Sequence, residues 1–362
     1  MQKYEGVDIM MMDDLLTDEE KAIRQTIRDW VEDRFLPVVT EHHRAGTFPT
    51  QLIPELGELG VFGANIHGYG CSALNNVAYG LMLQELERGD SGLRSVVSVQ
   101  GGLVMHPILA YGSEAQKDHW LPRLARGTAI GCFGLTEPDF GSNPGGMKTR
   151  ARKDGNHYVL NGAKMWITNG TVSDIAVVWA KNDDNVIQGF LVEKGTPGFR
   201  APEMKGKFSL RASITSELVL EDVRIPTANL LPKTGGLSSP LRCLTQARFG
   251  IAWGALGAAT ACYHAALEYS KDRIQFGKPI GSFQLVQNKL AWMVTEITKG
   301  QLLALQLGRL KDQGKMSHVQ VSMAKMNNCN IALDIARVAR EIHGANGILD
   351  EYPVIRHMLN ME

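Results

Sequence analysis

Four short stretches of the sequence combine glycine with hydroxyl, aromatic or guanidinium side chains, and they are where chemistry could take place. Glycine, as at Gly141 beside Ser142, permits close approach of the backbone to a ligand. A guanidinium, as at Arg273, grips a pyrophosphate as a two-pronged fork. The stretches are Cys132-Phe-Gly-Leu-Thr-Glu-Pro-Asp-Phe-Gly-Ser142, Lys164-Met-Trp-Ile-Thr-Asn169, Arg273-Ile-Gln-Phe-Gly-Lys-Pro279 with Gln284 after it, and Glu341-Ile-His-Gly-Ala-Asn-Gly347.

Several other kinds of site are excluded. The sequence has no Gly-x-Gly-x-x-Gly run after a strand, no phosphate-binding loop, no His-Glu-x-x-His and no Gly-x-Ser-x-Gly, so dinucleotide-binding, kinase and hydrolase signatures are missing. Lysine plus arginine equals aspartate plus glutamate at 38 each, which gives no electrostatic case for nucleic acid or an anionic membrane. No two of the five cysteines form a Cys-x-x-Cys pair, so we expect no metal centre and no disulfide framework. The cysteines are Cys71, Cys132, Cys243, Cys262 and Cys329.

The residues at the N-terminus predict no targeting signal. Residues 1–16 lack a cationic segment followed by an apolar run, and they are acidic where a mitochondrial leader would be basic. No apolar stretch reaches the ~20 residues needed to span a bilayer. We therefore expect a soluble cytoplasmic protein, or a mitochondrial matrix protein if the chain is a mature eukaryotic one.

Residues 1–130 are predicted to be helical. Thr17-Asp-Glu-Glu20 is a capping box ahead of an apolar repeat of period four, and Pro37 is expected to end that helix. Three more helices are predicted, one ending at Gly60, one running from Asn75 toward Glu87, and one after Glu114.

Residues 131–238 are predicted to form a β domain. Short β-rich runs alternate with glycine, proline and aspartate, and Asn161-Gly162 is a hairpin signal inside His157-Tyr-Val-Leu-Asn-Gly-Ala-Lys-Met-Trp-Ile-Thr168. Helical periodicity returns in residues 239–362, with long apolar-faced helices over 241–270 and 284–312 and a C-cap candidate at Gly344. The predicted fold is α+β and multi-domain: helices, a β-barrel-like middle domain, and a C-terminal helical bundle.

The four stretches resemble, in order and spacing, the flavin- and acyl-CoA-binding segments of the acyl-CoA dehydrogenase family. The resemblance covers almost the whole chain. It implies the acyl-CoA dehydrogenase fold, FAD as cofactor, and electron transfer from an acyl-CoA to an electron-transfer flavoprotein. On its flavin side it implies backbone and hydroxyl contacts from Phe133, Gly134, Leu135 and Thr136, a pyrophosphate contact at Gly141 and Ser142, and contacts from Trp166, Ile167 and Thr168. The family pattern is Gly-Ser-Asp where this chain has Asn143, so one charge is lost. Without the other motifs, Trp166 and Thr168 would be ordinary strand residues.

The resemblance also implies contacts that cross between subunits. Arg273, Phe276 and Gln284, together with Glu341, Gly344 and Ala345, match residues that reach the flavin of a neighbouring copy. The chain is therefore expected to form a homotetramer. The alternatives are a solvated cation at Arg273 and a plain helix cap at Gly344.

The run from Glu87 to Gln100 resembles the glutaryl-CoA branch of the family. A substrate that ends in a carboxylate cannot bury that charge unpaired, and a guanidinium is its natural partner. The resemblance assigns Arg94, Ser95 and Ser98 to the distal carboxylate and Glu87 to holding Arg94. It assigns Ser142 and Arg248 to the CoA portion. The reaction implied is oxidation of glutaryl-CoA to crotonyl-CoA with loss of CO2. The alternative is a surface arginine that pairs with Glu87 or Asp90.

No residue of the sequence can be assigned as the catalytic base. Some family members carry a glutamate where this chain has Ala247, and the glutaryl branch carries its base in a last helix just beyond the position of Glu362. Three further hypotheses stay open: a dehydrogenase for another short-chain acyl-CoA, a non-catalytic acyl-CoA or FAD-binding protein, and a purely structural helical protein.

Overall fold

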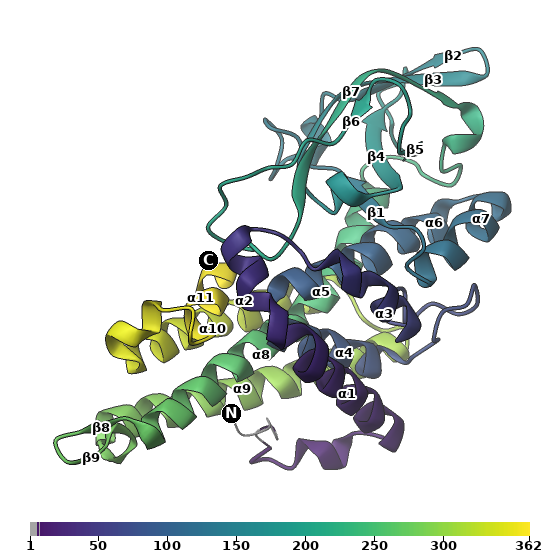
Figure 1. Cartoon of the computed structure of the whole chain (residues 1–362). Helices are drawn as coiled ribbons and strands as arrows, with labels where there is room; N and C mark the ends of the chain where they lie inside the picture. The colour runs from purple at the N-terminus through teal and green to yellow at the C-terminus, as the bar shows by residue number, and fades with distance from the viewer. Residues whose placement is uncertain (1–5, 7) are drawn as a thin grey trace.

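The computed structural model describes residues 6 and 8–362 (Figure 1). In chain order, a group of helices comes first, a β-sheet follows, and a second group of helices ends the chain. Residues 1–5 and 7, on which the targeting prediction partly rests, lie outside the described residues. The predicted α+β fold, helical then β then helical, is confirmed. The helices are α1 Asp18–Trp30, α2 Leu36–Ala45, α3 Ile53–Glu58, α4 Asn76–Gly89, α5 Ser91–Ser98, α6 His106–Tyr111, α7 Glu114–Ala125, α8 Ser238–Asp272, α9 Gln284–Asp312, α10 His318–Ile342 and α11 Val354–Met361, with π-helical segments η2 Val31–Phe35 and η4 Val99–Met105. Among the described residues, no helix is both long and apolar enough to cross a membrane.

One sheet holds the middle of the chain together. Its strand order is β1-β4-β2-β3-β7-β6, with β5 paired to β4. β1 is parallel to β4, whereas β3 is antiparallel to both β2 and β7. Its strands are β1 Gly131–Gly134, β2 Arg150–Asp154, β3 His157–Thr168, β4 Ile175–Lys181, β5 Ile187–Glu193, β6 Phe199–Arg200 and β7 Thr215–Pro226, and a separate hairpin of β8 Ile274–Gln275 and β9 Lys278–Pro279 follows α8.

The hairpin predicted at Asn161-Gly162 is wrong. Strand β3 runs unbroken through both residues, and Gly162, at φ 148°, sits at a register shift against β7. A Cβ at Gly162 would lie 2.7 Å from the Thr149 Cα, so glycine serves a close backbone approach here. The turn instead uses Gly155, at φ 57°, between β2 and β3.

Pro37 does not end the first helical run as predicted. The capping box at Thr17 starts α1, and the Glu20 N–H donates to the Thr17 hydroxyl at 3.2 Å. The chain then passes through the π-helical η2 and re-enters α-helix with Pro37 in the first turn of α2. Pro37 removes one N–H donor from a continuous helical run, and the π-helical η2 lies directly before α2, where the Leu36 N–H donates to the Val31 carbonyl. The run ends instead at Gly46, which has a left-handed φ of 69°.

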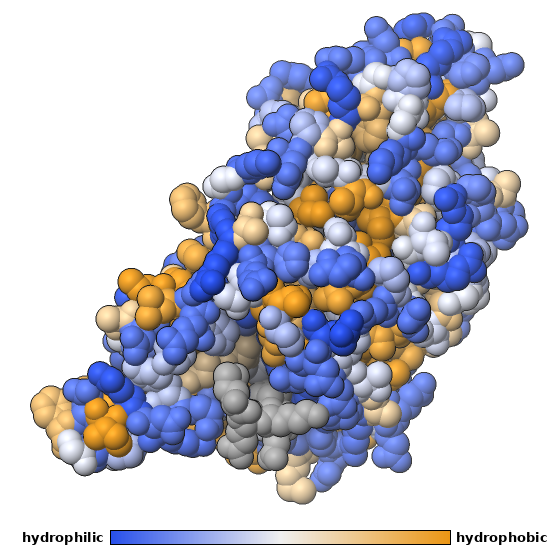
Figure 2. All heavy atoms as spheres, in the orientation of Figure 1, coloured by the Kyte–Doolittle hydropathy of each residue, from blue (hydrophilic) through white to orange (hydrophobic). Residues whose placement is uncertain are grey.

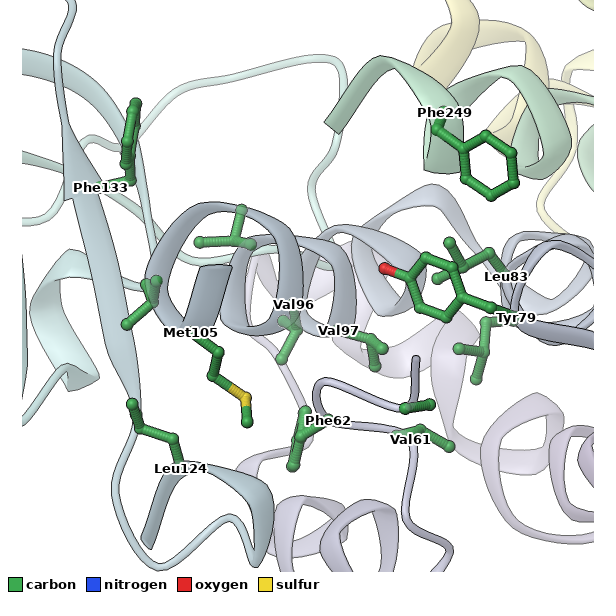
Figure 3. Close-up of a cluster of buried hydrophobic side chains, with 14 of the residues drawn as sticks. Val61, Phe62, Tyr79, Leu83, Val96, Val97, Met105, Leu124, Phe133 and Phe249 are labelled. Atoms are coloured by element: carbon green, nitrogen blue, oxygen red, sulfur yellow. The ribbon is translucent and has the colours of Figure 1, made fainter. Parts of the chain in front are cut away.

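The main hydrophobic core lies where the N-terminal helices, α8 and the sheet meet (Figure 3). Figure 3 shows Tyr79 and Phe249 side by side on the helical side and Phe133 at the edge of the sheet, with Val97 between them. Helix α4 is buried along nearly its whole length, from Val77 to Gly89. It is therefore the central helix of the fold, and the polar residues that it carries must find partners inside the protein.

Helices α4 and α8 touch almost backbone to backbone. A Cβ at Gly257 of α8 would lie 1.9 Å from the Gln84 carbonyl oxygen. One turn earlier, a Cβ at Gly254 would lie 2.0 Å from the Glu87 carboxylate. Glycine at these two positions lets the helices approach closely enough for Glu87 to lie against α8.

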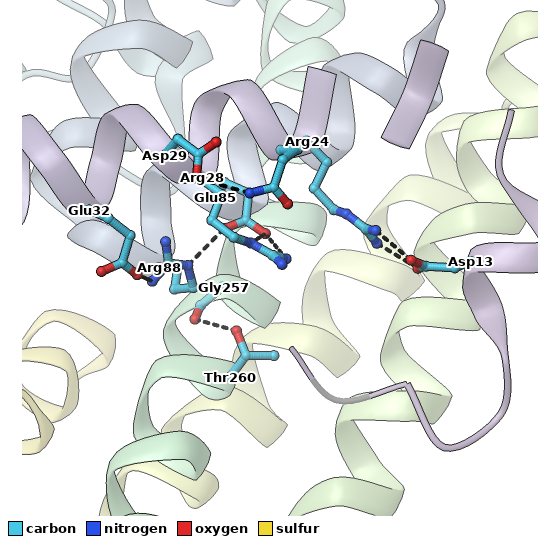
Figure 4. Close-up of polar contacts among 10 residues, drawn as sticks. Asp13, Arg24, Arg28, Asp29, Glu32, Glu85, Arg88, Gly257 and Thr260 are labelled. Atoms are coloured by element: carbon cyan, nitrogen blue, oxygen red, sulfur yellow. Dashed lines mark hydrogen bonds and ion pairs between the residues drawn. The ribbon is translucent and has the colours of Figure 1, made fainter. Parts of the chain in front are cut away.

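An ion-pair network joins α1, η2 and α4 (Figure 4). The Glu85 carboxylate, 2% exposed, pairs with Arg28 and with Arg88 at 2.7 Å each, and Arg88 also pairs with Glu32 at 2.6 Å. Burial opposes ionisation of Glu85, but the two guanidinium groups outweigh burial and lower its pKa. The buried charges are thus matched, which fixes the N-terminal helix on α4.

We predict that Gly257→Ala destabilises the fold by about 3 kcal/mol, at the upper end of overpacking costs, because a backbone carbonyl cannot move aside as a side chain can. Urea unfolding measures the loss. The matched control is Gly102→Ala, where a Cβ would come no nearer than 3.8 Å to any atom. Equal midpoints for the two variants would contradict close helix contact as the reason for Gly257.

Candidate functional site

The end of β1 and the end of β3 bring two predicted stretches together. The Met165 N–H donates to the Thr136 carbonyl at 2.9 Å, so Thr136 lies beside the β3 segment that ends at Thr168. Among the described residues, neither the Thr136 nor the Thr168 hydroxyl has a hydrogen-bond partner. Strand β1, which contains Phe133, is the first strand of the sheet, and an edge strand presents unpaired backbone groups. The Gly131 N–H of this strand donates to Gln100, so the groups shown to be free at this edge are the two threonine hydroxyls.

Trp166 is not packed as an ordinary strand aromatic. Its side chain is 58% exposed, and its φ of 62° is left-handed, at a register shift between Lys164 and Ile167. A left-handed conformation is costly for a bulky L-residue and is found most often at functional sites. The bulge turns the indole outward, while the neighbouring Ile167 stays 3% exposed in the sheet core.

A buried ion pair, which sequence reasoning missed, holds this corner in place. The Lys164 ammonium, fully buried, contacts the Glu137 carboxylate at 2.8 Å. Burial lowers the pKa of Lys164 to about 8, against the pull of Glu137. Burial opposes ionisation of Glu137, but Lys164 outweighs it and lowers the pKa of Glu137. Glu137 also accepts from the N–H groups of Lys148 and Thr149, at 2.6 and 3.0 Å. It thereby ties down both ends of the loop that carries Gly141 and Ser142, which are themselves exposed.

A second cluster lies at the α4–α5 junction. The Arg94 Nε donates to Glu87 at 2.6 Å, its Nη2 donates to Glu87 at 3.4 Å, and its Nη1 donates to the Ser98 hydroxyl at 3.1 Å. The Glu87 side chain is 1% exposed and that of Arg94 is 11% exposed. Ser95 is buried, and its carbonyl accepts from the Ser98 hydroxyl at 3.3 Å. Arg94 is therefore no surface arginine: it is a partly enclosed guanidinium held by a buried carboxylate.

Asp90 links this cluster to the C-terminal helix, and sequence reasoning missed that link. One carboxylate oxygen accepts from the Gly92 N–H at 2.7 Å and caps α5. The other accepts from Arg356 at 2.7 Å and from Asn360 at 2.9 Å, both on α11. The Asp90-Ser-Gly sequence carries the N-cap signal that could have located α5. The α11 partners could not be found this way, because they lie 266 and 270 residues away.

The remaining predicted residues lie apart from these clusters. Arg248 of α8 donates to Ser322 of α10 at 3.3 Å. Arg273 and Phe276 sit at the far tip of α8 and the β8–β9 hairpin, distant from the sheet in Figure 1. Phe276 is 93% exposed, and Figure 2 shows apolar atoms at that tip. Gln284, Glu341, Gly344 and Ala345 are exposed as well, and Gly344, at φ 59°, follows α10 as the predicted C-cap glycine. Within one chain, the residues from Arg273 to Gln284 and from Glu341 to Ala345 do not reach the sheet edge that carries Thr136 and Thr168.

Comparisons with known proteins now identify the class. Three family models match: the N-terminal domain of acyl-CoA dehydrogenase over residues 17–128, the middle domain over 132–223 and the C-terminal domain over 234–362. The chain belongs to the acyl-CoA dehydrogenase family and is an acyl-CoA dehydrogenase. Members of this family bind FAD, which is the cofactor of this chain. The exposed indole of Trp166 and the free hydroxyls of Thr136 and Thr168 fit such a group. Within the described residues, no group of three or more metal-binding side chains is present.

Individual proteins resemble the chain over nearly its full length. The crystal structure of a glutaryl-CoA dehydrogenase from Mycobacterium smegmatis in complex with FADH2 is 52% identical, with a TM-score of 0.97 over 99% of this chain and 92% of that one. A chain of a solved structure described as the electron transferring flavoprotein of Acidaminococcus fermentans is 36% identical, with a TM-score of 0.92 over 96% of this chain and 93% of that one. The short-chain specific acyl-CoA dehydrogenase of Megasphaera elsdenii is 38% identical over 96% and 93%.

We predict acid sensitivity from His357, which is fully buried on α11 and whose ring nitrogens have no hydrogen-bond partner among residues 6 and 8–362. Burial, and then the charges of Arg356 and Arg88, hold its pKa well below 6.5. Near pH 6, His357 therefore binds a proton in the unfolded chain but not in the folded chain. The free energy of unfolding falls as pH drops below about 6.5. Between pH 6.5 and 5, urea unfolding should show a loss about 2 kcal/mol larger in the wild type than in His357→Met. Replacement of the exposed His318 by Met is the control and should leave the loss unchanged.

Proposed function

We propose that the protein oxidises glutaryl-CoA to crotonyl-CoA with release of CO2 and passes the electrons to an electron-transfer flavoprotein. The observation that carries the proposal is the enclosed guanidinium of Arg94. Three of its five N–H groups are used by Glu87 and Ser98. Among the described residues nothing accepts from the other two N–H groups, which suit the two oxygens of a distal carboxylate. The 52% identical structure, that of a glutaryl-CoA dehydrogenase, supports the same substrate.

The charge of the anchor is set for this task. Glu87 neutralises Arg94 in the free protein, so a buried cation does not stand alone. A fatty-acyl chain would offer that guanidinium no acceptor, whereas a dicarboxylate half-thioester would complete its hydrogen bonds. An apolar acyl group would remove water from the Arg94 guanidinium without accepting its hydrogen bonds. Arg94 thus favours an acyl group that ends in a carboxylate.

The sheet edge is proposed to hold the flavin. Backbone groups of residues 133–136 and the hydroxyls of Thr136 and Thr168 would donate to the ring, and Trp166 would cover it. When bound, FAD supplies the acceptor for the substrate's β-hydride. Donors fixed before the reaction, as here by the Glu137–Lys164 pair, stabilise developing negative charge without reorganisation. Ser142 and Arg248 are proposed to contact the CoA portion.

A second copy of the chain is proposed to complete the cofactor site, within a homotetramer. The residues that face no part of their own chain's sheet are the ones assigned to this contact: Arg273, Phe276, Gln284, Glu341, Gly344 and Ala345. Phe276 supports it, since its ring is 93% exposed at a left-handed φ of 53°, and Ile274 of the same hairpin is exposed as well, so the tip offers an apolar surface to a partner.

A dehydrogenase for a short unbranched acyl-CoA is the second candidate. The Megasphaera elsdenii enzyme, named as short-chain specific, favours it. In that case the Glu87–Arg94 pair would be structural, and butyryl-CoA would be the better substrate.

We predict that Arg94→Ala lowers kcat/KM for glutaryl-CoA by about 100-fold or more, the usual effect of removing one partner of an enclosed charge pair. Turnover of butyryl-CoA should change little. The measurement is anaerobic bleaching of the flavin absorbance with each ester. Arg242→Ala, at an exposed position of α8, is the matched control.

Because Arg94→Ala leaves Glu87 buried without its partner, the double variant Glu87→Gln with Arg94→Gln provides a neutral pair for comparison. Equal losses with both esters would contradict a distal anchor and favour the short-chain candidate.

We further predict that Trp166→Gly weakens FAD binding by about tenfold, roughly 1.4 kcal/mol, through loss of the covering ring. The same change should stabilise the flavin-free protein by about 1 kcal/mol or more, since glycine adopts φ 62° without strain. FAD titration followed by fluorescence measures the first effect and thermal unfolding the second. Trp166→Phe keeps both an aromatic ring and the strain, so it should show neither effect in full. A Trp166→Gly protein that binds FAD normally would remove the tryptophan from the flavin site.

A further inference from the structure

A cavity lies among α4, η4, α6, α8 and α9. Its volume is about 240 Å³. Its polar lining comes from Asn65, His67, Tyr79, His106, Gln246 and Lys311. None of the residues assigned above to the flavin or to the acyl-CoA is among its lining residues, although its Tyr79 lies within electrostatic reach of Arg94.

The charge in this cavity is the ammonium of Lys311. It lies 4.0 Å from the centre of the Phe249 ring and 5.8 Å from that of Tyr79. Among the described residues it has no hydrogen-bond acceptor and no ion-pair partner. The neighbouring Asp312 carboxylate accepts from the Asn76 backbone and side chain at 2.7 Å each instead. Aromatic faces attract an ammonium but accept none of its three N–H groups well. Its unmet hydrogen bonds are therefore available to a ligand in the cavity.

The rest of the lining adds donors and no negative charge. No acidic side chain of the described chain lines the cavity. Burial, and then the charge of Lys311, lower the pKa of His106 to about 4, so its imidazole is neutral at pH 7. The Gln246 amide has no partner within residues 6 and 8–362. The cavity thus combines an ammonium that has no ion-pair partner among the described residues with other groups that can donate hydrogen bonds, which is the chemistry of an anion site.

Size limits the anion. At about 30 Å³ for each water molecule, 240 Å³ holds a four-atom anion with a few waters. It lies below the range of sites for larger organic ligands. We propose that this cavity binds a small carboxylate, of the size of acetate or bicarbonate, on Lys311.

Binding and protonation are coupled at this site. Burial lowers the pKa of Lys311 to about 7, with only Asp312 opposing. A bound carboxylate would supply the missing counter-charge and raise that pKa, so the protein takes up a proton as the anion binds. The polar groups that line the cavity beside Lys311 are Tyr79 of α4, the neutral His106 of α6, Gln246 of α8, and Asn65 and His67 of the loop before α4. None of them is an acid that could replace that counter-charge.

Calorimetric titration of the flavin-loaded protein with sodium acetate tests the proposal, in two buffers of different ionisation enthalpy. At pH 8, one unit above the lysine pKa of about 7, roughly 0.9 proton should be taken up per acetate bound. Affinity should fall about tenfold from pH 8 to pH 9. Lys311→Met should abolish the uptake and weaken binding by more than tenfold. Lys311→Arg, which keeps a charge that cannot be removed, should bind with no uptake and no loss at pH 9.

Two further variants locate the binding. Arg94→Ala must leave the uptake intact, because acetate at the proposed substrate anchor would otherwise explain the heat. Lys315→Met, at an exposed lysine just after α9, must also leave it intact. Titration with bicarbonate in place of acetate distinguishes dissolved CO2 from an organic acid as the source of the anion. Binding without proton uptake in the wild type, or unchanged uptake in Lys311→Met, would overturn the proposal.

Discussion

The close approach of α4 and α8 is the constraint on which the rest of the structure depends. Glycines at 254 and 257 remove the side chains that would separate the two helices. The central helix then lies fully buried, and its acidic residues meet their partners inside the protein. Glu87 reaches Arg94 from this helix, and Glu85 reaches the arginines that fix α1. The geometry of the proposed substrate anchor is thus a consequence of helix packing rather than of a flexible loop.

Buried charge is matched in each part of the site already described. Glu137 with Lys164 orders the sheet edge, Glu87 with Arg94 forms the anchor, and Asp90 with Arg356 joins α5 to α11. Such pairs add little net stability, but removal of one partner is costly, so they fix orientation. Lys311 departs from this pattern: its ammonium lies against aromatic rings and has no ion-pair partner in the part of the chain that the structure describes. This contrast is the reason for proposing that the cavity beside Lys311 binds an anion.

The two ends of the molecule differ in kind. The sheet edge carries free hydroxyls and an outward indole, whereas the tip of α8 and the β8–β9 hairpin carries an exposed phenylalanine and arginine far from that edge. Both sets belong to stretches that resemble the flavin-binding segments of the family. A symmetric assembly would satisfy both at once, because each copy would offer its tip to the edge of another.

The sequence by itself determined the class of fold and most elements, because capping boxes, apolar periods and turn residues act locally. The capping box at Thr17 and the glycine at Gly344 are examples. It misplaced the β2–β3 turn, since Asn161-Gly162 has the composition of a hairpin but serves a close contact with Thr149. Only the tertiary structure decided that Trp166 faces outward, that Asp90 binds Arg356 and that Lys311 lies against aromatic rings. Each of these depends on contacts between distant parts of the chain, which no local pattern encodes.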